Sequence, residues 1–259
     1  AADFADLTRE QREATAKCSK SQVVVVARLV SHEGATLYVA RYANCFRGNS
    51  EANIHAEEFM VTDKELLKVL DGRDRSGYGG AAPSAPARLL LYMTYQPCHH
   101  SGGRVPKAAL AREGAAVGEV AVHPTTCSER LREFFLSRVA PNGVGLTLIL
   151  ADVYKATWEE ELHPTDLERK VYGSKSGAAR EGMRLLLDVG VRMRGMRGDD
   201  WEYLVTLADD EVQREWERRG CLVDGGDGVV AASRFTPVHL ELRKGYDEYI
   251  GDYIDANWE

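Results

Sequence analysis

Residues 87–95 read ARLLLYMTY, an apolar run with the length of one buried strand. Upstream of it, the β-branched runs 22–30 and 36–44 flank a short turn that contains Gly34, which predicts a β-hairpin. Downstream, residues 144–154 form another apolar run and predict another buried strand. The chain is therefore expected to build a sheet from a hairpin and from strands that are distant in sequence.

Segments with apolar residues at helical spacing lie between these strands. They cover residues 54–70, 126–139 and 176–189, and a further strand is expected at 191–196. Asp63 is placed to cap a second helix within the first segment, and Thr125 or Thr126 to cap the second segment. Alternation of helices and strands after a hairpin predicts a mixed sheet covered by helices, an α/β or three-layer fold.

The remaining elements are expected toward the two ends. They are a short polar helix at 7–18, a strand or helix at 201–207, and helical stretches at 210–219 and 240–253.

Composition restricts the function. The 259 residues are 44% apolar, which is enough for a sizeable core, and no run of about 18 apolar residues predicts a membrane span. The first residues lack a basic segment followed by an apolar one, so we expect no signal peptide and a cytoplasmic or nuclear location. Five widely spaced cysteines fit a reducing compartment better than a disulfide framework. The net charge of −7 counts against a large non-specific nucleic-acid surface but leaves a local basic groove open.

Three short motifs predict a zinc site. His55-Ala56-Glu57 begins a helix, Pro97-Cys98 follows a strand, and Cys127 begins another helix. Imidazole and thiolate are preferred zinc ligands, and three of them leave a fourth position for water, whose pKa zinc lowers to about 7. Glu57 lies two residues after a ligand, where it can move protons without binding the metal. We therefore predict Zn²⁺ ligated by His55, Cys98 and Cys127, with Glu57 as the catalytic residue.

These motifs resemble the zinc-deaminase signature, His-x-Glu followed by Pro-Cys-x-x-Cys. The first half is unchanged, but Ser101 stands at the position of the second cysteine, and Cys127 lies 29 positions after Cys98. Residues 127–135 resemble the helix that opens with that cysteine, so we interpret the segment at about 99–124 as an insertion. Over roughly residues 20–207 the chain resembles the AID/APOBEC-like cytidine deaminases, in particular their branch outside vertebrates.

The resemblance implies a cytidine-deaminase-like three-layer α/β/α fold with a five-stranded mixed sheet. It places the deaminase domain at 1–208, followed by a helical extension at 209–259 packed on that domain. It further implies a base pocket whose expected residues are Asn44, Ala56, Tyr95, Pro97, Tyr154 and Trp158. Tyr154 is expected to stack on the cytosine, and Asn44 to contact the sugar, a role for which Asn53 is an alternative.

Several alternatives stay open from the sequence. His99 and His100 follow Cys98 and are rival ligands, although adjacent ligands strain a tetrahedral site. The expected activity is a hydrolase that converts cytosine to uracil in single-stranded DNA or RNA. A deaminase of free cytidine, deoxycytidine or their nucleotides is the alternative, and a catalytically silent, zinc-containing nucleic-acid-binding module is a second one. Adenine is also possible as the target, and the oligomeric state is left open.

Overall fold

The computed structural model describes residues 23–44, 55–72, 85–99, 126–153, 156, 166–208, 213–214, 218 and 237–258. The expected helix at 7–18, most of that at 210–219 and nearly all of the expected insertion lie outside these residues. The chain divides into two compact units, Ala1–Met193 and Arg194–Glu259. The domain boundary expected after residue 208 falls inside the second unit, and the assignment of the two domains stays a prediction.

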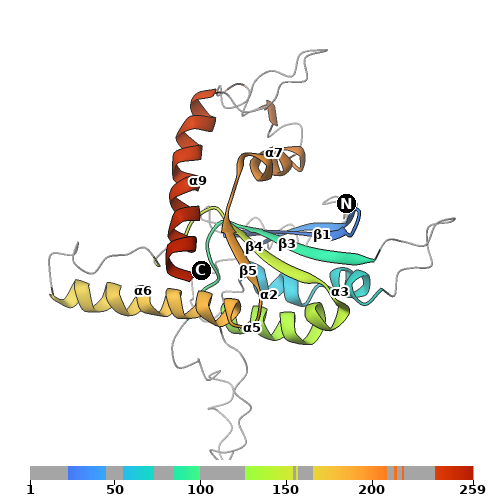
Figure 1. The fold of residues 1–259 in the computed structure, drawn as a ribbon, viewed down its shortest axis with the longest axis horizontal. Helices are drawn as coiled ribbons and strands as arrows, with labels where there is room; N and C mark the ends of the chain where they lie inside the picture. The colour runs from blue at the N-terminus through green and yellow to red at the C-terminus, as the bar shows by residue number, and fades with distance from the viewer. Residues whose placement is uncertain are drawn as a thin grey trace, which may run out of the picture. The chain divides into compact units, whose positions relative to one another are not determined.

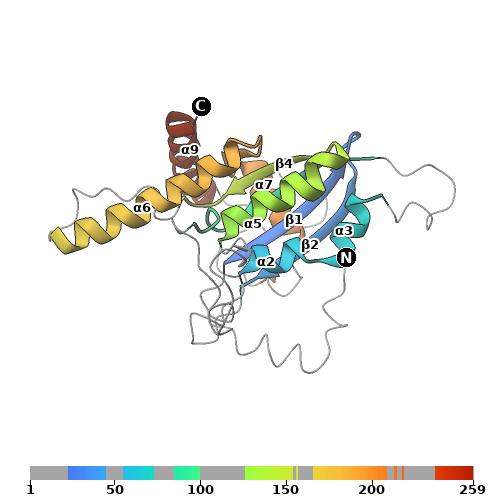
Figure 2. The same cartoon turned by 90° about the horizontal axis from the view of Figure 1, so that it is seen from below.

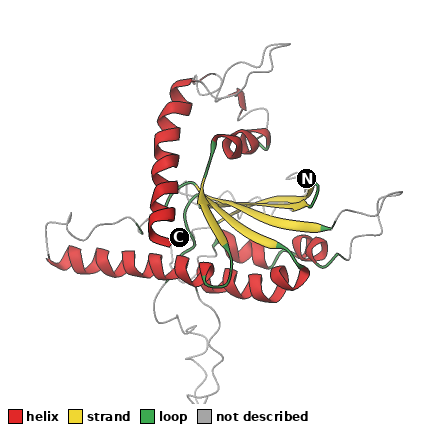
Figure 3. Cartoon of the chain, viewed as in Figure 1, coloured by secondary structure: helices red, strands yellow, loops and turns green. Residues whose placement is uncertain are grey.

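Five strands form one sheet (Figure 1). In chain order they are β1 (Val24–Ser31), β2 (Thr36–Ala43), β3 (Pro86–Met93), β4 (Gly145–Leu150) and β5 (Arg192–Gly195). Their order across the sheet is β2-β1-β3-β4-β5; β1 runs antiparallel to β2 and β3, whereas β3 and β4 are parallel. This arrangement confirms the expected mixed α/β fold, with strands and helices as coloured in Figure 3. A mixed five-stranded sheet is consistent with a three-layer α/β/α architecture.

The turn between β1 and β2 follows from two residues. Gly34 adopts φ 86°, a left-handed conformation that glycine reaches without a steric penalty. The Ser31 hydroxyl accepts hydrogen bonds from the backbone N–H groups of Glu33 and Ala35, each at 3.2 Å. These contacts fix the hairpin that the sequence predicts.

Strand β4 ends at Leu150, although the apolar run predicted a strand as far as residue 154. Its pairing with β3 stops at the pair Met93–Leu150. The chain of β3 then leaves the sheet toward Pro97, which has no N–H to donate to a ladder. The expected length was wrong because hydrophobicity continues beyond the point where the partner strand stops.

Four helices of the first unit cover one face of the sheet, as both views show (Figures 1 and 2). They are α2 (Ala56–Val61), α3 (Lys64–Leu70), α5 (Cys127–Phe134) and α6 (Asp166–Leu187). Helix α2 packs on β1 and β2, α5 packs beside α2, and α6 packs beside α5. Asp63 caps α3 and Thr126 caps α5, as expected. Helix α5 continues through a π-helical turn, Phe135–Val139, and a 3-10 turn, Ala140–Asn142.

Helix α6 begins at Asp166, well before the expected start at residue 176. The apolar stripe that predicted the helix begins only near Ser176, which is buried. Residues 166–175 are mostly charged or polar and offer no such stripe, but they include good helix formers such as Leu, Glu, Arg and Lys. The helix propensity of these residues therefore extends α6 into a segment where the spacing of apolar residues predicts no helix.

The core of the first unit lies between the sheet and these helices. Side chains at 0% exposure come from β1, β3, β4, α2, α3 and α5, and they include Leu29, Leu89, Leu91, Met93, Leu148, Met60, Leu66 and Leu131. Each contributes on the order of 1.5–3 kcal/mol by leaving water. Phe59, one of the apolar positions of the segment 54–70, is instead 40% exposed.

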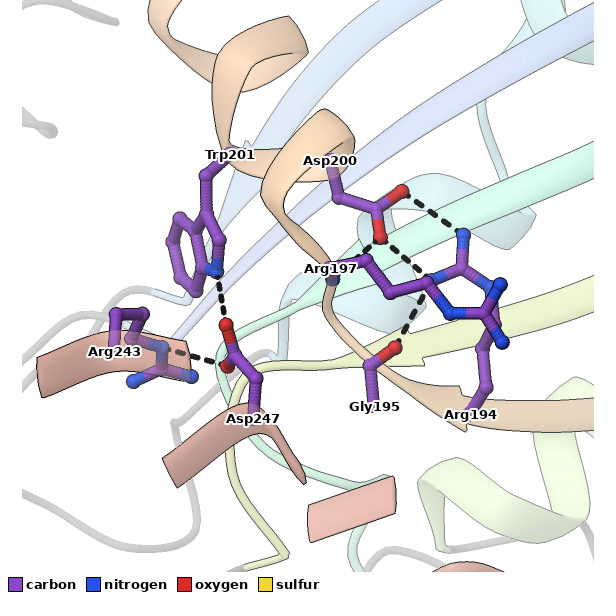
Figure 4. A network of polar contacts seen from close by, with 7 residues as sticks. All are labelled: Arg194, Gly195, Arg197, Asp200, Trp201, Arg243 and Asp247. Carbon is purple, nitrogen blue, oxygen red and sulfur yellow. Dashed lines mark hydrogen bonds and ion pairs between the residues drawn. The ribbon is translucent and has the colours of Figure 1, made fainter. Parts of the chain in front are cut away.

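The second unit contains α7 (Gly198–Thr206) and α9 (Pro237–Trp258), so the segment 201–207, predicted as strand or helix, is helical. Arg194 binds Asp200 through two nitrogens, at 2.6 and 2.9 Å. The same carboxylate accepts the backbone N–H of Arg197 at 2.8 Å, which caps α7 (Figure 4). A bidentate arginine pair and a cap thus share one aspartate.

A second aspartate, Asp247, connects α7 with α9 (Figure 4). It accepts hydrogen bonds from Trp201 Nε1 at 2.8 Å and from Arg243 Nε at 2.7 Å. The guanidinium of Arg243 also stacks over the ring of Trp201, 4.6 Å from its centre.

No helix among the described residues combines the length and the apolar character that crossing a bilayer requires.

Candidate metal centre

His55 precedes the first turn of α2, in extended backbone conformation. Its ring is directed toward two sulfur atoms: Nδ1 lies 3.1 Å from Cys127 Sγ and 3.5 Å from Cys98 Sγ. The three ligand atoms all lie within 4.8 Å of one another. In a tetrahedral zinc site, Zn–N and Zn–S bonds of about 2.0–2.3 Å separate neighbouring ligand atoms by roughly 3.4–3.8 Å. The spacing of the three side chains therefore fits one metal ion.

The two cysteines come from different elements. Cys98 lies in the segment that follows β3, and Cys127 is the first residue of α5. A capping box fixes the start of α5: Thr126 Oγ1 accepts the N–H of Glu129, while the Glu129 carboxylate accepts the N–H of Thr126. Cys127 thereby lies at a helix N-terminus, whose dipole favours the thiolate that a metal ion binds, although burial and Cys98 oppose ionisation in the metal-free chain.

The three groups share protons in the metal-free chain. A hydrogen bond from the Cys127 thiol, together with one from His55, lowers the pKa of Cys98 to about 4 although burial opposes the shift. The bond with Cys98 and burial raise the pKa of Cys127 well above its ordinary range. The bond with Cys98 raises the pKa of His55 to about 9, against the effect of burial. A metal ion would displace the protons on Cys127 and His55, since ligating thiols and imidazoles are deprotonated.

Glu57 lies beside this cluster but is not one of its ligands. Its side chain is 3% exposed, and its atom Oε2 has no hydrogen-bond partner among the described residues. Burial raises the pKa of Glu57 to about 7, and the charge on Cys98 adds to the rise. A buried carboxyl that titrates near neutrality can both accept and donate a proton at physiological pH. An orphaned oxygen next to three ligands also fits a site whose fourth position holds water.

His99 lies outside the ligand cluster. It is buried, its Nδ1 lies 3.3 Å from Thr126 Oγ1, and its Nε2 lies 3.8 Å from the carboxylate of Glu181. Among the described residues, only His55, Cys98 and Cys127 form a group able to hold a metal ion. His99 is therefore not the rival ligand that its position beside Cys98 suggests, and His100 lies outside the described residues.

The expected pocket residues are partly visible. Asn44 pairs with Val23, accepting its N–H through Oδ1 at 2.8 Å and donating its own N–H to the Val23 carbonyl at 3.0 Å. Ala56 and Pro97 are buried, and Tyr95 is half-buried just beyond β3. Tyr154, Trp158 and Asn53 lie outside the described residues. The substrate contacts of all these residues stay predictions.

One stabilising contact of the site has no signal in the sequence. Arg130 of α5 forms an ion pair with Glu58 of α2, with Nε 3.3 Å from Oε1. It joins the two helices that begin next to His55 and at Cys127. Such pairs between distant residues follow no local spacing rule, and only the packing of α2 beside α5 reveals this one.

The chain thus contains a His-Cys-Cys group that can hold a metal ion, with a buried carboxyl beside it. Comparison with protein-family models and with curated proteins gives no match to this chain.

Proposed function

We propose that the chain is a zinc-dependent deaminase that converts cytosine to uracil in single-stranded DNA or RNA. The observation that carries the proposal is the buried Glu57, with one unpartnered carboxylate oxygen beside three side chains spaced for zinc. The choice of cytosine as the target base and of a single strand as the substrate rests on the resemblance of residues 20–207 to AID/APOBEC-like deaminases. A base within a duplex hides its C4 atom, so a polymer substrate must present an unpaired or flipped nucleotide.

His55, Cys98 and Cys127 would hold the metal. A zinc ion bound there supplies hydroxide at neutral pH, because it lowers the pKa of a coordinated water to about 7. Glu57 Oε2 would accept one proton of the attacking water and deliver it to the ring nitrogen N3, and would then carry the second proton, from the new C4 hydroxyl, to the departing amine. The overall change adds water at C4 and releases ammonia. General acid–base catalysis of this kind contributes about 10²- to 10⁴-fold in rate.

The burial of Glu57 serves this role physically. In the metal-free chain burial raises the pKa of Glu57 to about 7, so neither protonation state dominates at neutral pH. An exposed glutamate with a pKa near 4.3 would be a weak acid catalyst at that pH. The cost of the buried carboxyl to folding is consistent with a functional reason for its position.

The test exposes pools of single-stranded DNA and RNA to the zinc-loaded protein and sequences them. We expect C-to-U changes that are absent with Glu57→Ala, while that variant keeps the zinc content of the parent protein. Unchanged pools with zinc bound would overturn the proposal. Retention of all biological effect by Glu57→Ala would instead favour the silent zinc-containing binding module.

A deaminase of free cytidine, deoxycytidine or their nucleotides is the second candidate. The net charge of −7 favours it, because a long polyanion gains affinity from Lys and Arg. It predicts turnover of mononucleotides and no change in oligomers. Adenosine and adenine-containing strands belong in the same assay, since the same zinc chemistry can attack C6 of adenine.

A further inference from the structure

The two cysteines of the metal centre are 29 positions apart in sequence, yet their segments are joined by direct contacts. Ser128, the residue after Cys127, is fully buried. Its backbone N–H donates to the carbonyl oxygen of Cys98 at 3.1 Å, and its hydroxyl lies 3.2 Å from the same oxygen and 3.3 Å from that of Pro97. The chain beside one cysteine thus binds the backbone of the other.

A second contact joins the residue that follows Cys98 to the residue that precedes Cys127. His99 follows Cys98, Thr126 precedes Cys127, and the two side chains meet at 3.3 Å. The Thr126 hydroxyl donates its proton to Glu129 Oε2 at 2.8 Å. It can therefore only accept from His99, so His99 carries a proton on Nδ1 in this contact. Each cysteine is consequently flanked by a residue that contacts the segment of the other.

Helix α6 packs against His99 and Ser128 at Gly182, which is buried. A Cβ atom at this position would lie 2.5 Å from His99 Cβ and 2.6 Å from Ser128 Oγ. A Cβ atom essentially never lies this close to a non-bonded atom, so any larger residue must displace His99, Ser128 or the helix. Gly182 costs helix stability relative to alanine, and the close approach gives the physical reason for glycine here.

We propose that His99, Ser128 and Gly182 form a cysteine clamp that positions Cys98 and Cys127 for the metal ion. The three act as positioning residues, because they contact the segments that carry the ligands and are not ligands themselves. In the deaminase signature the two cysteines are close because only two residues separate them. In this chain the packing of the clamp residues brings the two cysteines together. The inference rests on the zinc site of the proposed function but not on its substrate.

The test measures zinc affinity by competition with a chelator, and the visible absorption of the Co²⁺-substituted protein. Groups behind metal ligands typically contribute 10- to 100-fold in affinity. We expect Gly182→Ala to weaken zinc binding by about that factor and to alter the cobalt spectrum, which reports the arrangement of the ligands. The matched control is Gly177→Ala in the same helix, where a Cβ meets no atom within 4 Å. It should leave both readouts unchanged.

A second pair of variants tests the clamp without changing α6. His99→Leu removes the donor to Thr126 and should weaken zinc binding by about tenfold or more. His99→Asn keeps a donor near the position of Nδ1 and should restore most of the affinity. Circular dichroism shows which variants are folded, and His99→Leu decides the question if Gly182→Ala does not fold.

Parental zinc affinity and cobalt spectrum in folded Gly182→Ala and His99→Leu would overturn the clamp. Equal loss of affinity in His99→Leu and His99→Asn would overturn the role of the Thr126 contact. None of these measurements uses a nucleic acid. A protein that binds zinc through the clamp but deaminates nothing would therefore contradict the proposed function and leave the clamp intact.

Discussion

Glu57→Gln gives a direct test of the buried carboxyl that the proposed chemistry needs. Burial raises the pKa of Glu57 from 4.5 to about 7 in the metal-free chain. Between these two values the folded state binds more protons than the unfolded state, so stability falls as pH rises. One pKa unit corresponds to about 1.36 kcal/mol, which gives a loss of about 3 kcal/mol between pH 4.5 and pH 7. Glutamine cannot ionise and should not show this loss.

The measurement is urea unfolding of both proteins at pH 5 and pH 8, with excess chelator to keep them free of metal. We expect the free energy of unfolding of Glu57→Gln, relative to the parent, to increase by roughly 2–3 kcal/mol from the lower to the higher pH. Comparing one difference at two pH values removes the pH-independent cost of burying an amide. A relative stability that is the same at both pH values would refute the argument that Glu57 is a buried acid with a raised pKa.

Four further variants test one metal ligand, the hydrogen bonds of Asp63, and the two aspartates Asp200 and Asp247 of the second unit. Cys127→Ala should lose zinc, as measured by metal analysis of the purified protein, because two ligands remain of three; full metal content would exclude Cys127 as a ligand. Burial raises the pKa of Asp63, but hydrogen bonds from Tyr42, Tyr38 and two backbone amides outweigh it and hold the pKa below its ordinary value. Asp63→Asn should therefore destabilise the chain by about 1.5–3 kcal/mol at pH 7. That difference should shrink in urea unfolding as the pH falls below 3.8, and a constant difference would contradict it. In the second unit, Asp200→Ala should cost about 3 kcal/mol, since it removes a bidentate arginine partner and a helix cap. Asp247→Asn should cost less than about 1 kcal/mol, because burial raises the pKa of Asp247 despite its bonds to Trp201 and Arg243; unfolding monitored by tryptophan fluorescence compares the two.

The elements that the sequence predicts best are those whose signal is local. Asp63 and Thr126 cap their helices because a side-chain oxygen two or three residues before an N–H is a local geometry. The hairpin follows in the same way from Gly34 and its β-branched flanks. Errors arise where the apolar pattern does not show the cause: β4 ends because its partner β3 ends, and the helix propensity of residues 166–175 starts α6 early, without an apolar stripe.

The metal centre shows the same division. His55 and Glu57 are close in sequence, so local spacing places one beside the other, but their roles as ligand and acid–base group also needed Pro97-Cys98, Cys127 and the order of the elements. The grouping of Cys127 with His55 and Cys98 needed the further observation that residues 127–135 resemble a particular helix, and the structure brings the three ligand atoms within 4.8 Å of one another. The role of His99 could not be predicted, because its position beside Cys98 suggests a ligand whereas its ring contacts Thr126.

The arrangement around the cysteines connects these observations. A pair of ligands three positions apart is positioned mainly by the stiffness of the two residues between them, so its geometry depends little on the rest of the fold. A pair 29 positions apart can keep the same geometry only if tertiary contacts replace that stiffness. Ser128 and His99 supply such contacts in this chain, and Gly182 lets α6 lie close enough to support them. Metal affinity should therefore depend on the packing of α6, a helix that carries none of the three ligands.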